Sequence, residues 1–203
     1  MLIWINGAFG VGKTQTAHEL HRRLTASHVA DPELLGFAMH KMLPPARRDD
    51  FQDLPQWRTG VTQTLLDAEQ SSDCPVIVPM TLVDAEYFDE IVGGLIEHGV
   101  DVRHYTLTAS VEVIHRRLRA RLAHRLGPIL GADETWAMKQ TGRCVARLGE
   151  DRFASHVPAD ERSVDQVVEH IADDAGLELS RPRLSSARYQ LRRAAVAVRH
   201  IRT

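Results

Sequence analysis

Apolar positions along the chain follow two alternating spacings. Short apolar runs bounded by turn residues predict buried strands. These runs are residues 2–5, 27–32, 75–80, 102–107 and 153–157. Between them, apolar residues three and four positions apart predict amphipathic helices. These stretches are residues 13–25, 33–43, 84–98, 110–122, 134–148 and 164–175. The alternation predicts an α/β fold, in which a five-stranded parallel sheet carries helices on both faces.

The C-terminal segment differs in charge from the rest of the chain. Residues 181–203 contain seven arginines and no acidic residue, whereas the preceding 180 residues have a net charge of −9. An apolar stripe at helical spacing runs along the segment. It consists of Leu184, Ala187, Leu191, Ala194, Val198 and Ile201, with Arg188, Arg192 and Arg199 beside it. We therefore expect one domain over residues 1–180 and a basic amphipathic helix over residues 181–203.

Such a helix has three possible partners. Residues 183–202 can lie on an anionic membrane surface, where the alanines of the stripe would make attachment weak and reversible. The helix can instead pack on its own domain. RNA is the third candidate, but no aromatic platform accompanies the arginines, so we expect no nucleic-acid partner.

Cysteine usage and hydropathy favour a cytoplasmic protein. Cys74 and Cys144 lack the spacing of a metal site or a disulfide framework, so we expect reduced thiols. The first predicted strand leaves no room for a signal peptide, and no apolar run approaches the roughly 20 residues that span a bilayer. The expected location is the cytoplasm, with peripheral attachment to the inner face of the membrane as the alternative.

The loop after the first predicted strand carries the clearest chemical signal. Gly7-Ala8-Phe9-Gly10-Val11-Gly12-Lys13-Thr14 matches the phosphate-loop pattern G-x-x-x-x-G-K-[ST]. Its glycines let backbone N–H groups point at phosphate oxygens, and the following helix adds a favourable dipole. We expect this loop, together with Gln15, to bind ATP. Lys13 would contact the terminal phosphates and the Thr14 hydroxyl would bind Mg²⁺. An ordinary glycine turn is the alternative, and the flanking strand and helix argue against it.

Asp31 ends the second predicted strand, at the edge where ligands bind in open parallel sheets. Its carboxylate can take the proton of a substrate hydroxyl that attacks the γ-phosphate, or help to hold Mg²⁺. It can also cap the helix that begins at Pro32 and Glu33. Both roles are compatible, and we predict Asp31 as the catalytic base and a substrate-binding residue.

Residues 47–58 are dense in charge and include two aromatic residues. A solvated loop and an aromatic loop folded back on the core are two interpretations. The third is a substrate-binding insert containing Gln52, in which Phe51 and Trp57 offer ring faces and Arg58 an anion contact. We adopt the insert as the prediction.

Five arginines fall within residues 116–125. They are Arg116, Arg117, Arg119, Arg121 and Arg125, and three of them lie at four-residue spacing on one helix edge. Guanidinium groups there would offset the charge of a transferring phosphoryl group. We therefore predict Arg117 and Arg121 as catalytic and residues 115–140 as a lid. Surface arginines are the alternative, because the chain has 22 arginines and only three lysines.

The end of the third predicted strand limits the class of phosphate-loop protein. Pro79-Met80-Thr81 stands where many of these proteins carry an aspartate for Mg²⁺, and the nearest acid is Asp84. This absence argues against a motor or switch ATPase. The chain also lacks an Asn-Lys-x-Asp motif, which argues against a GTPase.

Segments along the whole chain resemble one known family. They are residues 3–10, 12–17, 31–33, 49–52, 57–58, 78–81, 86–88, 117–119, 143–145 and 200–202. These segments are similar to the tunicamycin resistance proteins, within the adenylate-kinase-like branch of phosphate-loop kinases. Residues 125–130 are an additional stretch in the lid that departs from the pattern of this family. The resemblance implies binding of ATP and of tunicamycin, a lipid-tailed uridine antibiotic, and attachment to the membrane through the C-terminal helix.

Together these features predict an ATP- and Mg²⁺-dependent phosphotransferase. Its substrate would be a small nucleoside-like amphiphile, with tunicamycin as the leading candidate, and its activity would confer tunicamycin resistance. The alternative is a non-catalytic protein that sequesters tunicamycin at the membrane surface, with ATP acting only to close the lid.

Overall fold

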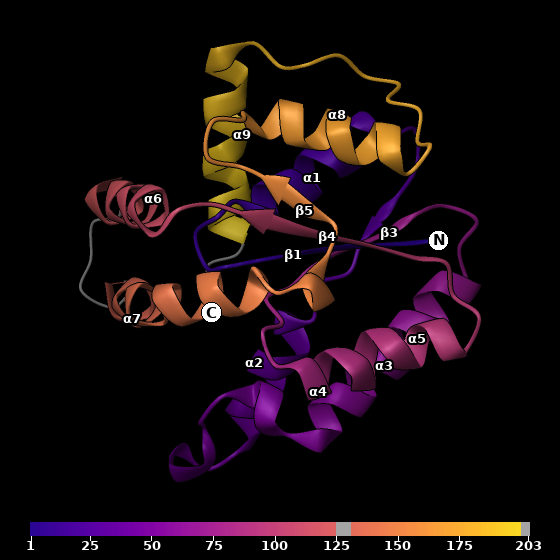
Figure 1. Ribbon diagram of the computed structural model, residues 1–203, viewed down its shortest axis with the longest axis vertical. Helices are drawn as coiled ribbons and strands as arrows, with labels where there is room; N and C mark the ends of the chain where they lie inside the picture. Colours follow the sequence, from indigo (N-terminus) through magenta and orange to yellow (C-terminus); the bar gives the residue numbers. More distant parts are fainter. Residues whose placement is uncertain (125–130, 200–203) are drawn as a thin grey trace.

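A five-stranded parallel sheet with the strand order β2-β3-β1-β4-β5 forms the centre of the molecule (Figure 1). The computed structural model describes residues 1–124 and 131–199, and the backbone alone for residues 121–124, 131–136, 193–194 and 197–199. The strands are β1 (Leu2–Gly7), β2 (His28–Val29), β3 (Val76–Pro79), β4 (Val102–Thr108) and β5 (His156–Pro158). The predicted parallel sheet is confirmed.

Helices cover both faces of this sheet, as the sequence predicts (Figure 1). One face carries α1 (Lys13–Arg23), α8 (Val164–Asp174) and α9 (Ser186–Arg199). The other carries α3 (Pro55–Gln70), α4 (Ala85–Phe88) and α5 (Gly94–Glu97). Beyond the carboxyl ends of the strands lie α6 (Val111–His124) and α7 (Gly131–Leu148). The chain after β2 forms α2 (Glu33–Met42) and two short 3₁₀ turns, η1 (Pro45–Arg47) and η2 (Phe51–Asp53).

β1 lies in the middle of the sheet, and its side chains alternate between two cores. Leu2 and Trp4 join the core under α3, whereas Ile3 and Ile5 join the core under α1 and α8, and all four are fully buried. A central parallel strand covered on both faces therefore has a continuous apolar sequence. Pairing with β3 and β4 brings the loops after these three strands to one edge of the sheet.

α3 is the main element that the apolar spacing did not predict. Trp57, Val61 and Leu65 form a buried stripe with one residue per turn, which is narrower than the stripe of most amphipathic helices. Gly60 and several threonines lower the helix propensity of the stretch. These features explain why the sequence analysis did not predict a helix here. In the structure, residues 55–58 of the predicted insert are the first turn of α3.

The helix predicted at 84–98 is present with an irregular middle. Asp84 caps it, since Asp84 Oδ1 accepts hydrogen bonds from Glu86 N at 2.9 Å and Tyr87 N at 3.3 Å. A π-helical turn, η3 (Asp89–Gly93), separates α4 from α5. π turns of this kind are frequent near functional sites. The helix ends before Gly99, whose φ is +84°.

The terminal helix α9 packs on its own domain. Arg192 Nη2 donates a hydrogen bond to His18 O of α1 at 3.1 Å, and Val196 is 5 % exposed. Leu191, a member of the predicted apolar stripe, is 73 % exposed. The structure does not describe the side chains of the predicted stripe residues Ala194 and Val198, and it does not describe Ile201. Among the described residues, no helix is long and apolar enough to cross a membrane.

Candidate active site

The loop between β1 and α1 has the backbone of a phosphate-binding loop. Gly7, Gly10 and Gly12 have φ angles of +143°, +86° and +123°, which favour glycine. A Cβ on Gly7 would lie 2.8 Å from Leu107 O, and one on Gly10 would lie 2.9 Å from Leu118 Cδ2. No side chain caps the start of α1, so its first turn presents backbone N–H groups to the loop. This arrangement fits the phosphates of a nucleoside triphosphate.

Lys13 lies inside this loop. Its Nζ donates hydrogen bonds to Gly7 O at 3.0 Å and Ala8 O at 3.3 Å, and lies 5.4 Å from the centroid of the Phe9 ring. Its side chain therefore starts from the position that a phosphate-contacting lysine needs. Thr14 follows in the first turn of α1. Its hydroxyl fits Mg²⁺, which usually takes few protein ligands and completes its shell with phosphate and water oxygens. Among the described residues, no group of three His, Cys, Asp or Glu side chains could hold a metal ion.

The Asn6 side chain links the start of the loop to the segment after β3 by hydrogen bonds. Its fully buried side chain accepts hydrogen bonds from Gly7 N at 2.8 Å and Leu82 N at 3.0 Å, and donates to Leu82 O at 2.9 Å. Thr81, the residue before Leu82, donates from Oγ1 to Gly7 O at 3.0 Å. The loop and the strand end therefore hold each other in place.

His104 on β4 supports this junction. Its Nδ1 lies 2.8 Å from Ala154 O, and its Nε2 lies 3.4 Å from Asn6 Nδ2. Burial lowers the pKa of His104 to about 4, so the ring is neutral at pH 7. A neutral ring that donates from Nδ1 leaves Nε2 to accept from Asn6.

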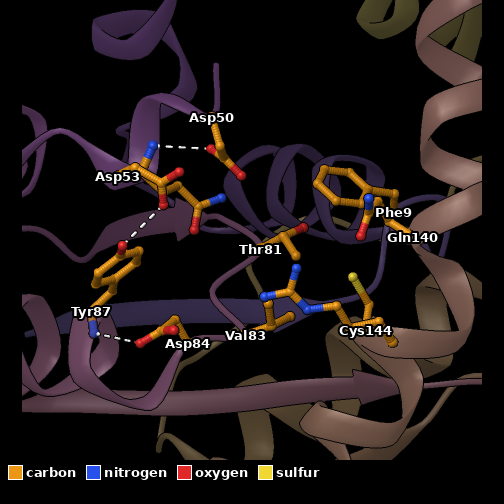
Figure 2. A pocket seen from close by; sticks show the side chains of 11 residues that line it. Phe9, Asp50, Asp53, Thr81, Val83, Asp84, Tyr87, Gln140 and Cys144 are labelled. Carbon is orange, nitrogen blue, oxygen red and sulfur yellow. Dashed lines mark hydrogen bonds between the residues drawn. The ribbon is translucent and has the colours of Figure 1, made fainter.

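A cavity of about 340 Å³ lies beside the phosphate loop (Figure 2). Four segments line it: the loop, η2 and its preceding residue, the segment after β3, and α7. The lining residues are Phe9, Asp50, Gln52, Asp53, Thr81, Val83, Asp84, Tyr87, Gln140, Arg143 and Cys144. Because the cavity sits at the carboxyl ends of β1 and β3, it occupies the usual ligand position of an open parallel sheet.

Arg58 lies behind one wall of the cavity, which corrects its predicted role as an anion contact. Its side chain is 8 % exposed, and Nε donates to Glu90 Oε2 at 2.5 Å. The guanidinium also lies 4.1 Å from the centroid of the Tyr87 ring. The Tyr87 hydroxyl in turn donates to Asp53 Oδ1 at 2.9 Å. Arg58 therefore positions Tyr87 and, through it, Asp53.

Trp57 does not offer a ring face to a ligand, so that part of the predicted insert is wrong. The side chain is fully buried, and Nε1 donates a hydrogen bond to Pro32 O at 3.1 Å. The Phe51 ring packs on it with 5.2 Å between ring centroids and meets Phe37 edge to face. Both aromatic residues fold back on the core. Gln52, which lies next to Phe51, does line the cavity.

Asp31 lies two residues beyond the end of β2, which is shorter than predicted, and apart from the cavity lining. Asp31 Oδ1 accepts a hydrogen bond from Glu33 N at 3.0 Å, as a residue at the start of a helix does. This contact matches the helix-capping role expected for Asp31, and its role as a catalytic base stays a prediction.

Arg117 joins the phosphate loop to the segment after β5. Its Nη1 donates to Val11 O at 2.8 Å and its Nη2 to Ala159 O at 2.6 Å. Arg116 and Arg119 are exposed. The side chain of Arg121 and the whole of Arg125 lie outside the described residues, so the predicted arginine edge is described at Arg117 alone.

Several cavity residues were not among the site residues predicted from the sequence, although some lie in the charged stretch 47–58 or in segments of the family resemblance. Asp50, Asp53 and Asp84 are ordinary turn and cap residues in sequence, and Arg143 and Cys144 belong to an amphipathic helix some 90 residues further along. Their one signal is local, because Asp50 and Asp53 bracket the aromatic residue of the charged stretch. Only the packing of α7 opposite η2 brings the two groups together.

Comparison with known proteins defines the class of this chain first. Residues 2–143 match the model of the AAA domain family. A sugar kinase from Janibacter sp. is 18 % identical, with a TM-score of 0.59 over 88 % of this chain and 96 % of that one. The Mycobacterium tuberculosis APS kinase in complex with AMPPNP and APS is 16 % identical, with a TM-score of 0.54 over 86 % and 96 %. The fold is therefore that of a phosphate-loop kinase.

A solved structure of higher similarity gives the particular family. The tunicamycin resistance protein of Deinococcus radiodurans is 31 % identical, with a TM-score of 0.73 over 89 % of this chain and 99 % of that one. The chain belongs to the tunicamycin resistance protein family. A comparison of its sequence with curated proteins finds no match.

Proposed function

We propose that this protein is an ATP-dependent phosphotransferase that acts on a small nucleoside-like amphiphile and confers resistance to tunicamycin. The observation that carries the proposal is the cavity of about 340 Å³ that shares Phe9 with the phosphate loop. A phosphoryl donor and an acceptor must be neighbours for direct transfer. The name of the Deinococcus relative supports tunicamycin as the acceptor.

Residues 7–15 would hold the triphosphate, and Thr14 would bind its Mg²⁺. When bound, ATP supplies the phosphoryl group, and Mg²⁺ neutralises part of its charge. Lys13 would exchange its hydrogen bonds to Gly7 O and Ala8 O for phosphate oxygens. Arg117 keeps the loop in register with the segment after β5, and Arg121 would contribute further positive charge as residues 115–140 close as a lid.

The acceptor would lie in the cavity between η2 and α7. Gln52 supplies an amide at its wall, while Phe51 and Arg58 support the wall from behind. Asp31 remains the sequence-based proposal for the base. If Asp31→Asn retained full turnover with unchanged ATP affinity, that role would be withdrawn.

A second candidate function is ATP-dependent sequestration of tunicamycin without chemistry. Thr81 rather than an acid follows β3, and its hydroxyl already donates to Gly7 O. The site therefore offers Mg²⁺ fewer protein oxygens than a strand-end carboxylate would. A protein of this kind would bind ATP and drug stoichiometrically and form no ADP.

The basic C-terminal segment, residues 181–203, would attach the protein weakly to the inner face of the membrane. Arg188 and Leu191 are exposed on α9, whereas Arg192 is engaged with α1. Co-sedimentation with phosphatidylglycerol vesicles, but not with phosphatidylcholine vesicles, would support this proposal. Loss of that binding in Arg188→Glu is expected, and equal binding to both vesicles would overturn it.

Mass spectrometry of tunicamycin separates the two functions. The drug is incubated with purified protein, ATP and Mg²⁺, with Lys13→Ala as the control. A mass gain of one phosphoryl group, lost in the variant, supports phosphotransfer. Unmodified drug that co-elutes with the protein only in the presence of ATP supports sequestration and overturns the first proposal.

A further inference from the structure

The Asp50 carboxylate lines the cavity and accepts few hydrogen bonds. Asp50 Oδ1 accepts one hydrogen bond, from Gln52 N at 3.0 Å, and the described residues provide no other. Figure 2 shows Asp50 and Asp53 on the side of the cavity opposite Gln140 and Cys144. The 3₁₀ turn η2 therefore holds the carboxylate by its backbone and leaves its second oxygen to a ligand.

The other carboxylates near the cavity are already engaged by hydrogen bonds. Asp53 accepts the Tyr87 hydroxyl, and Asp84 accepts two backbone N–H groups at the start of α4. Asp31 accepts Glu33 N and does not line the cavity.

The surroundings of Asp50 favour proton uptake. Asp50 is exposed as a residue, but partial burial of its carboxylate raises its pKa, and the nearby charge of Asp53 raises it further. The Gln52 N–H, His40 on α2 and Arg143 on α7 act in the opposite direction. A carboxylate with a raised pKa is a stronger base.

The charge of Asp50 reaches the same thiol as that of Lys13. Burial raises the pKa of Cys144, the charges of Lys13 and Arg143 lower it, and the charge of Asp50 raises it. Cys144 itself lines the cavity.

Gln52 places an amide group beside Asp50 at the cavity wall. Its side chain is 9 % exposed and lines the cavity. Within the part of the chain that the structure describes, its amide group has no hydrogen-bond partner. The amide is therefore open to a polar group of a ligand in the cavity.

We propose that Asp50 takes the proton of the acceptor hydroxyl and that the Gln52 amide holds the same part of the substrate. This inference rests on the proposed phosphotransferase function. The hydroxyl oxygen forms a bond to the γ-phosphorus as the bond between that phosphorus and the β,γ-bridging oxygen breaks. The hydroxyl proton passes to an Asp50 oxygen, ADP leaves, and Asp50 later releases the proton to water.

Steady-state phosphoryl transfer to tunicamycin by Asp50→Asn tests the inference. Asparagine keeps the shape of the side chain and an oxygen for Gln52 N, so η2 should persist. We expect kcat to fall about 100-fold or more, with unchanged ATP affinity. In the wild type, kcat/KM plotted against pH should fall at acid pH as Asp50 becomes protonated. This acid limb of the pH profile should disappear in the variant. Asp50→Ser, which keeps a capping hydroxyl, is the second variant if Asp50→Asn does not fold.

Two matched variants complete the experiment. Asp49→Asn removes a carboxylate one residue away that is exposed like Asp50 but does not line the cavity, and it should leave kcat unchanged. Gln52→Met keeps the length of the side chain and should raise KM more than it lowers kcat. Full kcat and an unchanged acid limb in Asp50→Asn would overturn the inference, as would a loss of ATP affinity equal to the loss of rate. Absence of transfer by the wild type would instead refute the phosphotransferase function itself.

Discussion

Two neighbouring residues, Trp57 and Arg58, shape the cavity without touching its interior. Trp57 fills the core behind η2, and Arg58 holds the Tyr87 ring against Asp53. A tryptophan and an arginine in a charged stretch suit a binding loop equally well, because composition does not record which way a side chain points. The sequence predicts the loop residues from Gly7 to Thr14 far better, because their backbone angles require glycine at fixed positions.

Trp57→Ala should unfold the protein more readily rather than remove a ligand contact. We expect the free energy of unfolding to fall by about 3–5 kcal/mol, because a fully buried indole and its hydrogen bond to Pro32 O are lost. Urea unfolding measures this change. Leu191→Ala, at a 73 % exposed position, is the control and should stay within about 0.5 kcal/mol of the wild type. An equally small change for Trp57→Ala would contradict its placement in the core.

His104 should make the folded state sensitive to mild acid. Its pKa is about 4 in the folded protein, whereas an unfolded chain has the ordinary value near 6.5. Between these values the unfolded state binds more protons, so stability should fall as the pH drops from about 6.5 to 4, by at most about 1.4 kcal/mol per pH unit. Urea unfolding of wild type and His104→Gln at pH 7 and pH 5 tests this. The variant should lose less stability between the two pH values, and equal losses would exclude His104 as the cause.

At the scale of elements, the contact between α2 and η2 fixes the acceptor side of the cavity. Gly36 on α2 lets the Phe51 ring approach the helix backbone, and Phe51 lies between Asp50 and Gln52. The apolar spacing predicted α2 as residues 33–43, one residue longer than the observed Glu33–Met42, yet it missed α3, whose buried stripe has only one residue per turn. The position of η2 depends on both helices, so the sequence could not place its side chains.

Gly36→Ala should displace η2 and impair the acceptor site selectively. A Cβ on Gly36 would lie 2.4 Å from Phe51 Cγ, so the ring and the flanking residues must move. We expect a higher KM for the acceptor, unchanged ATP affinity and a loss of stability of about 1–3 kcal/mol. Acceptor kinetics and urea unfolding measure these effects.

A second substitution can provide the control for this change. Phe51→Leu in the Gly36→Ala background gives the new methyl group room and should recover part of the lost affinity. Gly142→Ala on α7, where a Cβ would meet no atom within 4 Å, should leave acceptor binding unchanged. Equal effects of Gly36→Ala and Gly142→Ala would show that the contact with Phe51 does not position the site.

At the scale of the whole molecule, the cavity exists because four segments far apart in sequence meet at one edge of the sheet. Alternating strands and helices predicted the parallel sheet and the position of the loop after β1. They could not predict that α7 packs opposite η2, since this depends on the path of the chain beyond β4. The fold was therefore accessible from sequence, whereas the acceptor wall became visible only in three dimensions.

The transfer of a phosphoryl group from ATP to a ligand in this cavity is the central claim. ³¹P NMR of one reaction mixture containing the protein, ATP, Mg²⁺ and tunicamycin tests it most directly. The account predicts that the γ-phosphate signal of ATP declines while ADP and a new phosphomonoester appear in equal amounts, and that Lys13→Ala forms neither. ADP with inorganic phosphate alone, or ATP that persists unchanged beside bound drug, would contradict it.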